Sequence, residues 1–333
     1  MRRVTVFGGS GFLGRHLVQR LAARGAVVRV AVRDPEAAGF LKPMGNVGQI
    51  VPVRADVRDE AAVAAAVDGA DGVVNLVGIL YARGRRSFAA LHVDGAARVA
   101  RGARTSGARR FVHLSALGAG ANSASSYARS KAAGEVAVRR EFPAATILKP
   151  SVVFGPEDDF FTRFAALARV LPALPVFGCT PKLDTAHWPP RLELWGRGGT
   201  RFQPVYVGDV ADAIMRALDG DSAAHGAPGK TYELGGPRVY SFKEIMELVL
   251  AQTQRRRWLV PLPFFVADIQ GALLGMLPNP PLTADQAKLL RADNVVAPGA
   301  LALADLGIVP VSAEAILPTY MERFRNRGRF AGP

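Results

Sequence analysis

A glycine-rich turn between a strand and a helix constrains the fold of this chain more than any other feature. In VFGGSGFLG (6–14), Gly8, Gly11 and Gly14 follow the short strand RRVTVF (2–7) and precede an amphipathic helix. The first glycine allows a tight turn, the second lets the backbone approach a pyrophosphate, and the third lets the helix pack closely on the strand. The free N–H groups at the start of the helix attract phosphate. The pattern therefore predicts a dinucleotide-binding site.

Strand-like and helix-like segments alternate along the first half of the chain. Strands are predicted at 2–7, 26–32, 48–57, 71–78, 109–118 and 145–155. Each pair of strands is separated by a helical or loop segment, and this order is typical of a parallel sheet covered on both faces. The predicted fold class is therefore α/β, a Rossmann-type doubly wound parallel sheet.

The pattern loosens after Gly155. A strand and helix at 203–218 are expected to return to the first domain, and 230–236 reads as another strand. Residues 241–330 read mainly as helices interrupted by proline. We expect a dinucleotide-binding domain that comprises 1–155 plus about 203–220. A smaller, discontinuous C-terminal domain for substrate or partner binding is expected to comprise 156–202 and 221–333.

Composition narrows the possible partners. The net charge of +14 comes mostly from arginines spread along all 333 residues, without a nucleic-acid-binding motif. We therefore expect no nucleic-acid partner and interpret the charge as a compositional bias with attraction to an acidic partner or an anionic membrane surface. Cys179 is the only cysteine and the five histidines lack metal-ligand spacing, so neither an intrachain disulfide nor a metal site is predicted. No signal peptide or membrane-spanning run is recognisable, which predicts a soluble or peripheral protein.

The end of the second predicted strand bears on the choice between NAD and NADP. An acidic residue there would bind the ribose 2′-OH, whereas an arginine would pair with a 2′-phosphate. The sequence VAVRDP places Arg33 at this position and Asp34 one residue later, and Arg15 adds a second positive charge beside the glycine turn. We prefer NADPH, with a solvated Arg33 and an NAD-binding Asp34 as the alternatives.

Tyr127 and Lys131 form a possible proton-transfer pair in the segment YARSK. Four residues apart on a helix, they share one face. A nearby ammonium is expected to lower the pKa of the tyrosine from about 10, so that it can act as general acid or base during hydride transfer. Ser115, at the end of the fifth predicted strand, would orient a substrate carbonyl. The alternative is an ordinary exposed tyrosine and lysine on a helix surface.

Together these motifs resemble the extended or atypical short-chain dehydrogenases/reductases over residues 1–240. The segments RADV (54–57), NLVG (75–78) and KPSVVFG (149–155) extend the resemblance. It implies that Asp56 and Val57 lie by the adenine, and that Leu76 to Gly78 pass the ribose and pyrophosphate. Nicotinamide contacts are implied for Pro150 to Val153. The predicted cofactor-binding residues are Gly8, Ser10, Gly11, Phe12, Leu13, Gly14, Arg15, Arg33, Asp56, Val57, Leu76, Val77, Gly78, Tyr127, Lys131, Pro150 and Val153.

A narrower resemblance is to the Rossmann-fold accessory subunit of respiratory complex I, the NADH:ubiquinone oxidoreductase. It rests on FLKPMGNVGQI (40–50), KPSVVFGPEDDFF (149–161) and RFQPVYVGDV (201–210). That branch keeps a tightly held NADPH without established turnover and stabilises the junction of the peripheral and membrane arms. The resemblance implies complex I subunits near the quinone site as partners. It also implies a cytoplasmic location, peripheral on the inner face of the respiratory membrane.

Two features of this sequence differ from the family pattern and bear on activity. His92 stands where many catalytic relatives carry an asparagine of a proton relay, which weakens the case for turnover. Residues 173–200 are longer than is usual in the branch, and we interpret them as a loop, with a partner-binding element or a lid as alternatives. Ser115, Tyr127 and Lys131 nevertheless remain as a catalytic set. Alternative functions are an active NADP-dependent oxidoreductase or epimerase on a nucleotide sugar, sterol-like or isoprenoid substrate, and a sensor of the NADPH/NADP ratio.

A second candidate interface lies near the C-terminus, at about 255–282. Three arginines and Trp258 precede an apolar stretch that is too short and too polar to span a bilayer. Basic residues, an aromatic ring and an apolar helix face suit a membrane headgroup region or a groove on a membrane-embedded partner. The alternative is an ordinary core helix, but the complex I resemblance favours the interface.

Overall fold

The chain forms two compact units. The computed structural model describes residues 2–179, 182–184, 191–219, 228–278 and 280–325. The first unit contains Met1–Pro150, Val207–Leu234 and Val296–Pro310, and the second contains Ser151–Tyr206, Gly235–Val295 and Val311–Pro333.

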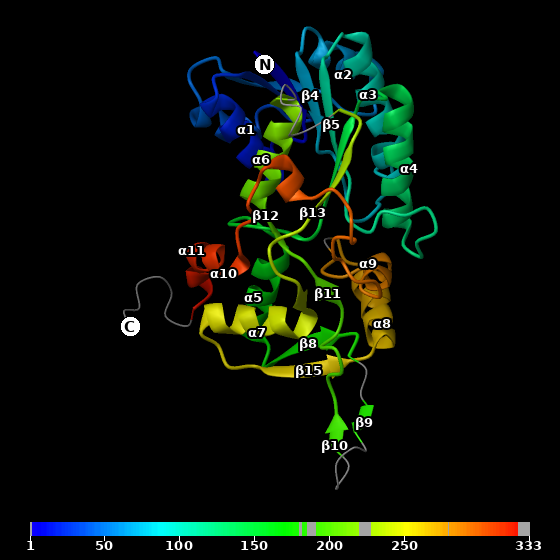
Figure 1. Ribbon diagram of the computed structural model, residues 1–333, viewed down its shortest axis with the longest axis vertical. Coiled ribbons are helices and arrows are strands. Elements are labelled where there is room, and N and C mark those ends of the chain that lie inside the picture. Colours follow the sequence, from blue (N-terminus) through cyan, green and yellow to red (C-terminus); the bar gives the residue numbers. More distant parts are fainter. Residues whose placement is uncertain (1, 180–181, 185–190, 220–227, 279, 326–333) are drawn as a thin grey trace. The chain divides into compact units, whose positions relative to one another are not determined.

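A seven-stranded sheet, parallel throughout, forms the centre of the first unit (Figure 1). Its order is β13-β6-β5-β4-β1-β2-β3, so the strand order reverses between β1 and β4, where doubly wound folds bind their ligands. This confirms the predicted α/β fold class. β13 joins the sheet although its residues fall in the range expected for the smaller domain. The strands are β1 (Arg3–Phe7), β2 (Val27–Val32), β3 (Ile50–Arg54), β4 (Gly72–Asn75), β5 (Arg110–Leu114), β6 (Thr146–Pro150) and β13 (Thr231–Leu234).

Helices cover both faces of this sheet (Figure 1). On one face α1 packs against α6, and on the other α2, α3 and α4 lie side by side. Each turns an apolar stripe to the sheet because its branched and alanine residues recur at helical spacing, as Leu17, Val18 and Leu21 do in α1. The helices are α1 (Phe12–Ala23), α2 (Glu60–Val67), α3 (Gly95–Thr105), α4 (Ser126–Glu141) and α6 (Val207–Asp219), with shorter turns η1 (Gly39–Met44), η2 (Ala89–Asp94) and η3 (Leu303–Leu306).

The second unit has an aromatic core. Phe154, Phe161 and Phe242 are at most 1 % exposed, and Phe177 and Phe202 are 5 % exposed. The described part of this unit contains four short strand pairs: β7 (Val153–Phe154) with β12 (Val205–Tyr206), β8 (Ala173–Phe177) with β15 (Trp258–Leu262), β11 (Arg201–Phe202) with β14 (Tyr240–Ser241), and β9 (Lys182–Asp184) with β10 (Arg191–Glu193). Its helices are α5 (Phe160–Val170), α7 (Phe242–Thr253), α8 (Phe264–Leu274), α9 (Ala284–Leu289), α10 (Ala313–Ile316), α11 (Pro318–Met321) and the turn η4 (Glu322–Phe324).

One expectation for the second unit was wrong. Residues 173–200 are not simply a loop, because β8 contributes Leu174 and Val176, both fully buried, to the core and β9 and β10 pair as antiparallel strands. The described part of the segment 241–330 is mainly helical, and it also contains β15, which pairs with β8 in parallel. Pro261 conceals this strand in the sequence, since proline lacks the N–H that a central strand needs. No helix in the described part of the chain is long and apolar enough to cross a membrane.

Candidate functional site

The glycine turn has the geometry that a bound pyrophosphate requires. Gly8 has a φ of +78°, which a residue with a side chain rarely adopts. A Cβ on Gly14 would lie 2.4 Å from the Gly8 carbonyl oxygen, so only glycine allows α1 to approach the turn this closely. Gly11 is the N-cap of α1, and no described side chain caps the first amides of the helix. The turn and the helix start therefore form a cradle suited to a dinucleotide phosphate.

The other predicted residues of this turn have different environments. Ser10 and Phe12 are partly exposed, whereas Leu13 is buried and anchors α1 to the sheet. The guanidinium of Arg15 stacks over the ring of Phe40, 5.2 Å from its centroid. This contact holds a positive charge on the first turn of α1.

The aspartates that follow β2 and β3 have different hydrogen-bond partners. Asp34 accepts hydrogen bonds from the backbone N–H groups of Glu36 and Ala37, at 3.1 and 3.2 Å, so its carboxylate stabilises the turn after β2. Arg33 beside it is exposed. Asp56, after β3, binds the guanidinium of Arg58 through both oxygens, and this contact lowers the pKa of Asp56 to about 2.

The segment after β4 is held by buried groups. Leu76 donates its backbone N–H to Phe7 at 3.0 Å, and Val77 donates to the Asn75 side chain at 3.1 Å. A Cβ on Gly78 would lie 3.3 Å from the Lys131 ammonium nitrogen. The structure therefore brings Lys131 next to the predicted cofactor segment 76–78.

The predicted pair of Tyr127 and Lys131 lies on one face of α4. The cap residue Ser125 accepts from the backbone of Ala128 at 3.3 Å and starts the helix just before Tyr127. Lys131 is 5 % exposed and donates to the Leu114 carbonyl at 3.1 Å. Burial lowers the pKa of Lys131 to about 8, against the opposing effect of Glu135. Its ammonium is thus an internal cation at the edge of the cofactor segment.

The expected lowering of the tyrosine pKa is not found. Burial raises the pKa of Tyr127 to about 12. Its ring packs edge-on against Phe88 and His92, with centroids 6.0 and 5.5 Å away, and the residue is partly buried. Tyr127 therefore stays protonated near neutral pH. The sequence argument was wrong here because it counted the charge of Lys131 and omitted the cost of burying a phenolate.

His92 is fixed in a single neutral tautomer. Its Nε2 accepts from the backbone N–H of Ile79 at 3.0 Å, and its Nδ1 lies 2.8 Å from the hydroxyl of Ser130. Ser130 donates onward to the Tyr127 carbonyl at 2.7 Å. A proton on Nε2 would face the Ile79 N–H, and burial lowers the pKa of His92 to about 3. With both ring nitrogens engaged, His92 does not relay protons in this arrangement.

A π-helical turn places His92 at this position. The wide turn η2 runs directly into α3, and such turns inside helices often occur at functional sites. Gly134 on α4 packs against this turn, since a Cβ there would lie 2.1 Å from the His92 carbonyl oxygen. Close approach of α4 to η2 thus aligns His92 with Tyr127.

Ser115 is bound to a carboxylate that the sequence analysis did not include. Its hydroxyl donates to Glu135, and Lys149 lies 3.6 Å from the same carboxylate. Because a hydroxyl has one proton, Ser115 cannot donate it to a substrate carbonyl at the same time. Glu135 was overlooked, although its position four residues after Lys131 placed it on the same helix face.

Pro150 and Val153 fall in different units. Pro150 ends β6 and accepts from the backbone N–H of Leu117 at 2.9 Å, whereas Val153 begins β7 of the second unit. In the described part of the chain no group of three or more histidine, cysteine, aspartate or glutamate residues is arranged to hold a metal ion.

Two buried neutral histidines make stability dependent on pH. His113 is 2 % exposed, and burial lowers its pKa to about 3, as for His92. Asn75 faces its Nδ1 at 3.4 Å, and its Nε2 has no hydrogen-bond partner among the described residues. An unfolded histidine binds a proton below about pH 6.5, so the unfolded state is favoured as pH falls through this value.

We therefore expect the free energy of unfolding to fall by about 2 kcal/mol for each of these histidines between pH 7 and pH 5. Urea unfolding across this range measures the slope, and the double variant His92→Asn, His113→Asn should flatten it. An equally steep slope in the double variant would show that other groups carry the dependence.

Comparison with known proteins agrees with this geometry. The family model described as "NAD dependent epimerase/dehydratase family" matches residues 4–235. The chain is 36 % identical over 335 residues to NADH dehydrogenase (ubiquinone) 1 alpha subcomplex subunit 9, mitochondrial, of Arabidopsis thaliana, covering 97 % of this chain and 78 % of that protein. The chain belongs to the NAD dependent epimerase/dehydratase family, in its subunit 9 branch.

Further similarities extend over the whole chain. The NADH-ubiquinone oxidoreductase 40 kDa subunit of Neurospora crassa is 32 % identical over 99 % of this chain and 81 % of that protein. The solved structure of an NADPH-dependent quinone oxidoreductase from Escherichia coli superposes with a TM-score of 0.69 at 18 % identity, covering 96 % of this chain and 98 % of that one. At this identity the structural match shows the fold alone.

Proposed function

We propose that this chain is an accessory subunit of a respiratory complex I, in which it holds NADPH as a structural ligand and catalyses no reaction of its own. The observation that carries the proposal is sequence identity of 31–36 % to complex I subunits over 96 % or more of this chain. A ligand held only by the folded state stabilises that state. The nucleotide would therefore maintain the fold that the partner subunits bind.

The residues that follow β2 support NADPH, and not NADH, as the nucleotide in this proposal. Asp34 is the residue that would bind a 2′-OH, but its carboxylate accepts hydrogen bonds from backbone N–H groups of the turn after β2. Arg33 is exposed beside it. The planar guanidinium of Arg33 matches the oxygens of a 2′-phosphate. Arg15 on α1 adds a second positive charge near the glycine turn. These contacts support a 2′-phosphate at this edge of the sheet.

Arg33→Ala is expected to weaken NADPH binding about 10- to 100-fold while NADH binding changes little, because a charge-assisted phosphate contact is lost. Isothermal titration with both nucleotides measures the two affinities. Arg216→Ala, on the exposed side of α6, removes an arginine elsewhere in the same unit and should change neither. An equal loss for both nucleotides would argue against 2′-phosphate recognition.

The same site supports a cofactor that is held and not turned over. His92 is locked between Ile79 and Ser130, and the Ser115 proton is donated to Glu135. Tyr127 has a raised pKa, so it is a poor base at neutral pH. Lys131 remains beside Gly78, where it can hold a ribose. The groups needed to bind the nucleotide are therefore in place, whereas those needed to activate a substrate are engaged elsewhere.

The surface of the second unit supports attachment to a membrane through residues 255–282. The exposed face of α8 carries large apolar side chains at helical spacing, with Phe265, Ile269 and Leu273 exposed by 61, 56 and 64 %. Its buried face carries Ala267 and Gly271. A helix of a soluble domain normally buries its large residues and exposes small or polar ones. The reversed pattern of α8 suits insertion into an apolar phase.

Basic and aromatic residues next to α8 fit the same surface. Trp258 is 81 % exposed, and Arg256 is exposed beside it. The pKa of Arg255 is lowered by burial and by the positive charges of Arg257 and Arg169, so these arginines form a cationic cluster. Arginine and tryptophan suit the anionic headgroup layer. We place the protein on the inner face of the respiratory membrane, beside the complex I subunits near the quinone site.

Purification of the native protein from its own membranes tests the function. We expect co-migration with NADH:quinone oxidoreductase subunits and recovery of stoichiometric NADPH that does not exchange. The alternative is an active NADP-dependent oxidoreductase, which the retained Tyr127 and Lys131 favour. A free protein whose NADPH is oxidised when a substrate is added would support that alternative and exclude the accessory role.

A further inference from the structure

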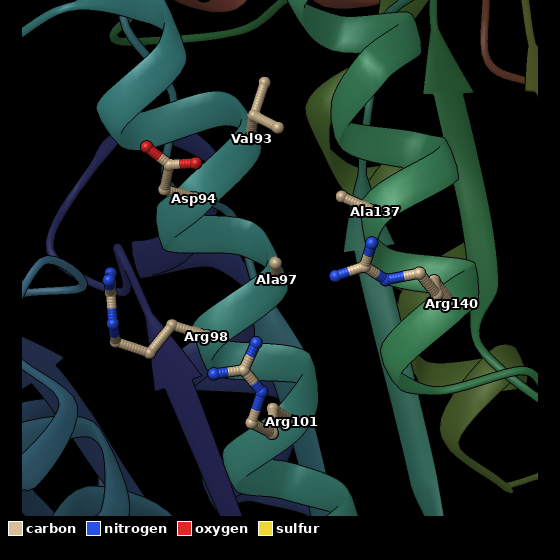
Figure 2. Close-up of a pocket in the computed structure, with 7 residues that line it drawn as sticks. All are labelled: Val93, Asp94, Ala97, Arg98, Arg101, Ala137 and Arg140. Carbon is tan, nitrogen blue, oxygen red and sulfur yellow. The ribbon is translucent and has the colours of Figure 1, made fainter.

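A groove of about 360 Å³ lies between α3 and α4 in the first unit (Figure 2). Ala97 on α3 and Ala137 on α4 face each other across it, and their small side chains leave the space between the helices open. Val93 and Asp94 line one end. None of the predicted site residues lines the groove, so the proposed function does not explain it.

Arginines from both helices line this groove. Figure 2 shows the guanidinium group of Arg140 directed from α4 toward α3, that of Arg101 lying over α3, and that of Arg98 directed to the side of α3 away from α4. Three arginines therefore line it against one carboxylate, that of Asp94. Arg140 has a side chain that is 80 % exposed, and it is available to an incoming anion.

A buried carboxylate organises these arginines. Glu141 has a side chain that is 10 % exposed and lies within 3.1 Å of Arg101, 3.4 Å of Arg140 and 3.9 Å of Arg104. The hydrogen bond from Arg101 lowers the pKa of Glu141, which stays ionised and offsets only one of these three charges. Glu60 lies 3.5 Å from Arg101 and adds a second, exposed carboxylate. Arg101 is thus held in place, as a preorganised contact requires.

We propose that this groove binds an acidic helical segment of a partner protein. Carboxylates spaced one turn apart on such a segment would meet Arg101 and Arg140, and the small side chains of Ala97 and Ala137 would let the backbone of the segment approach closely. The proposal rests on the proposed function, because the respiratory assembly supplies the partner. It goes beyond that function by placing a partner-binding site on the first unit, in addition to the apolar face of α8 in the second unit.

Charge and shape favour this occupant over two others. Each copy carries Arg98, Arg101, Arg104 and Arg140 against the carboxylates of Asp94, Glu60 and Glu141, so docking the groove onto the same groove of a second copy would bring two surfaces of net positive charge together, which is repulsive. A bilayer is disfavoured because the apolar lining residues are two alanines and Val93, and no large aromatic or aliphatic side chain lines the groove.

Site-directed cross-linking in the native assembly identifies the occupant. A photoreactive benzoylphenylalanine replaces Ala137, and the assembly is purified before and after illumination. We expect a cross-link to an acidic segment of a neighbouring subunit. A cross-link to a second copy of this chain, to lipid, or to nothing at all in an assembly that still contains the chain would overturn the proposal. Absence of the chain from the assembly would instead refute the proposed function.

Charge reversal gives an independent measurement. Arg98→Glu with Arg140→Glu should lower the yield of the assembled protein about 10-fold or more at low salt, and the difference from the unmodified protein should narrow as salt is raised, because salt screens both the attraction and the repulsion. Because Arg98 also donates to the Val57 carbonyl at 2.8 Å, the melting temperature and nucleotide content are measured in parallel. The control Arg109→Glu with Arg216→Glu makes the same net charge change away from the groove. Equal losses in both variants would overturn the proposal.

Discussion

Lys131→Ala is expected to empty the nucleotide site, whereas Tyr127→Phe should leave the nucleotide bound. Lys131 is a buried cation whose nitrogen lies beside Gly78, where the proposed cofactor passes. Removing its charge-assisted hydrogen bonds to a ribose should weaken NADPH binding about 100-fold. Tyr127 is packed mainly by its ring, against Phe88 and His92, and the phenylalanine variant keeps this packing.

The measurement is the amount of NADPH recovered per protein, together with the fraction of protein in the native assembly. Lys149→Ala is a matched control, because it also removes a lysine beside Glu135 but leaves Lys131 in place. Loss of nucleotide in Lys131→Ala should be accompanied by loss of assembly. If Tyr127→Phe abolished function while NADPH stayed bound, proton transfer by the tyrosine would be real and the non-catalytic proposal would be wrong.

Acidic substitutions on the exposed face of α8 should release the protein from the membrane. Ile269 and Leu273 are 56 and 64 % exposed, so glutamate at these positions should not disturb the fold. Each side chain inserted into an apolar phase contributes about 1.5–3 kcal/mol. Ile269→Glu with Leu273→Glu should therefore lower membrane attachment at least 100-fold.

Flotation with vesicles containing anionic lipid, and recovery in native membranes, measure this attachment. The control is Val47→Glu with Val309→Glu, which changes two exposed valines, 106 and 87 % exposed, in the first unit. The control should bind like the unmodified protein. Full retention of the α8 variant on both vesicles and membranes would contradict membrane docking, whereas retention on membranes alone would indicate a protein partner for this face.

Much of the first unit was predictable because its signals are local. The glycine turn, the alternation of short β-branched strands with helices and the spacing of Tyr127 and Lys131 each depend on residues close in sequence. The predicted strands were confirmed with shorter bounds, such as Arg110–Leu114 for the strand expected at 109–118. Strand ends are less predictable, because the last residues of a strand are set by the partner strand.

The second unit was less predictable because its elements pair over long distances. β15 pairs with β8, more than eighty residues earlier, and Pro261 obscures it as a strand. The segment 173–177 reads as a loop until its partner is known. The apolar stretch 255–282 was recognised, but only the structure separates its strand from α8 and shows that the large side chains of the helix face outward.

The sequence by itself determined the doubly wound fold, the dinucleotide cradle and the residue types at the candidate site, because glycine conformation and side-chain periodicity are properties of adjacent residues. Only the tertiary structure decided how those residues can act. It brought Glu135 to Ser115, Ile79 to His92 and Leu114 to Lys131, and it raised the pKa of Tyr127. Hydrogen-bond partners and pKa values depend on groups that folding brings together, and these groups determine whether a sequence motif can carry out chemistry.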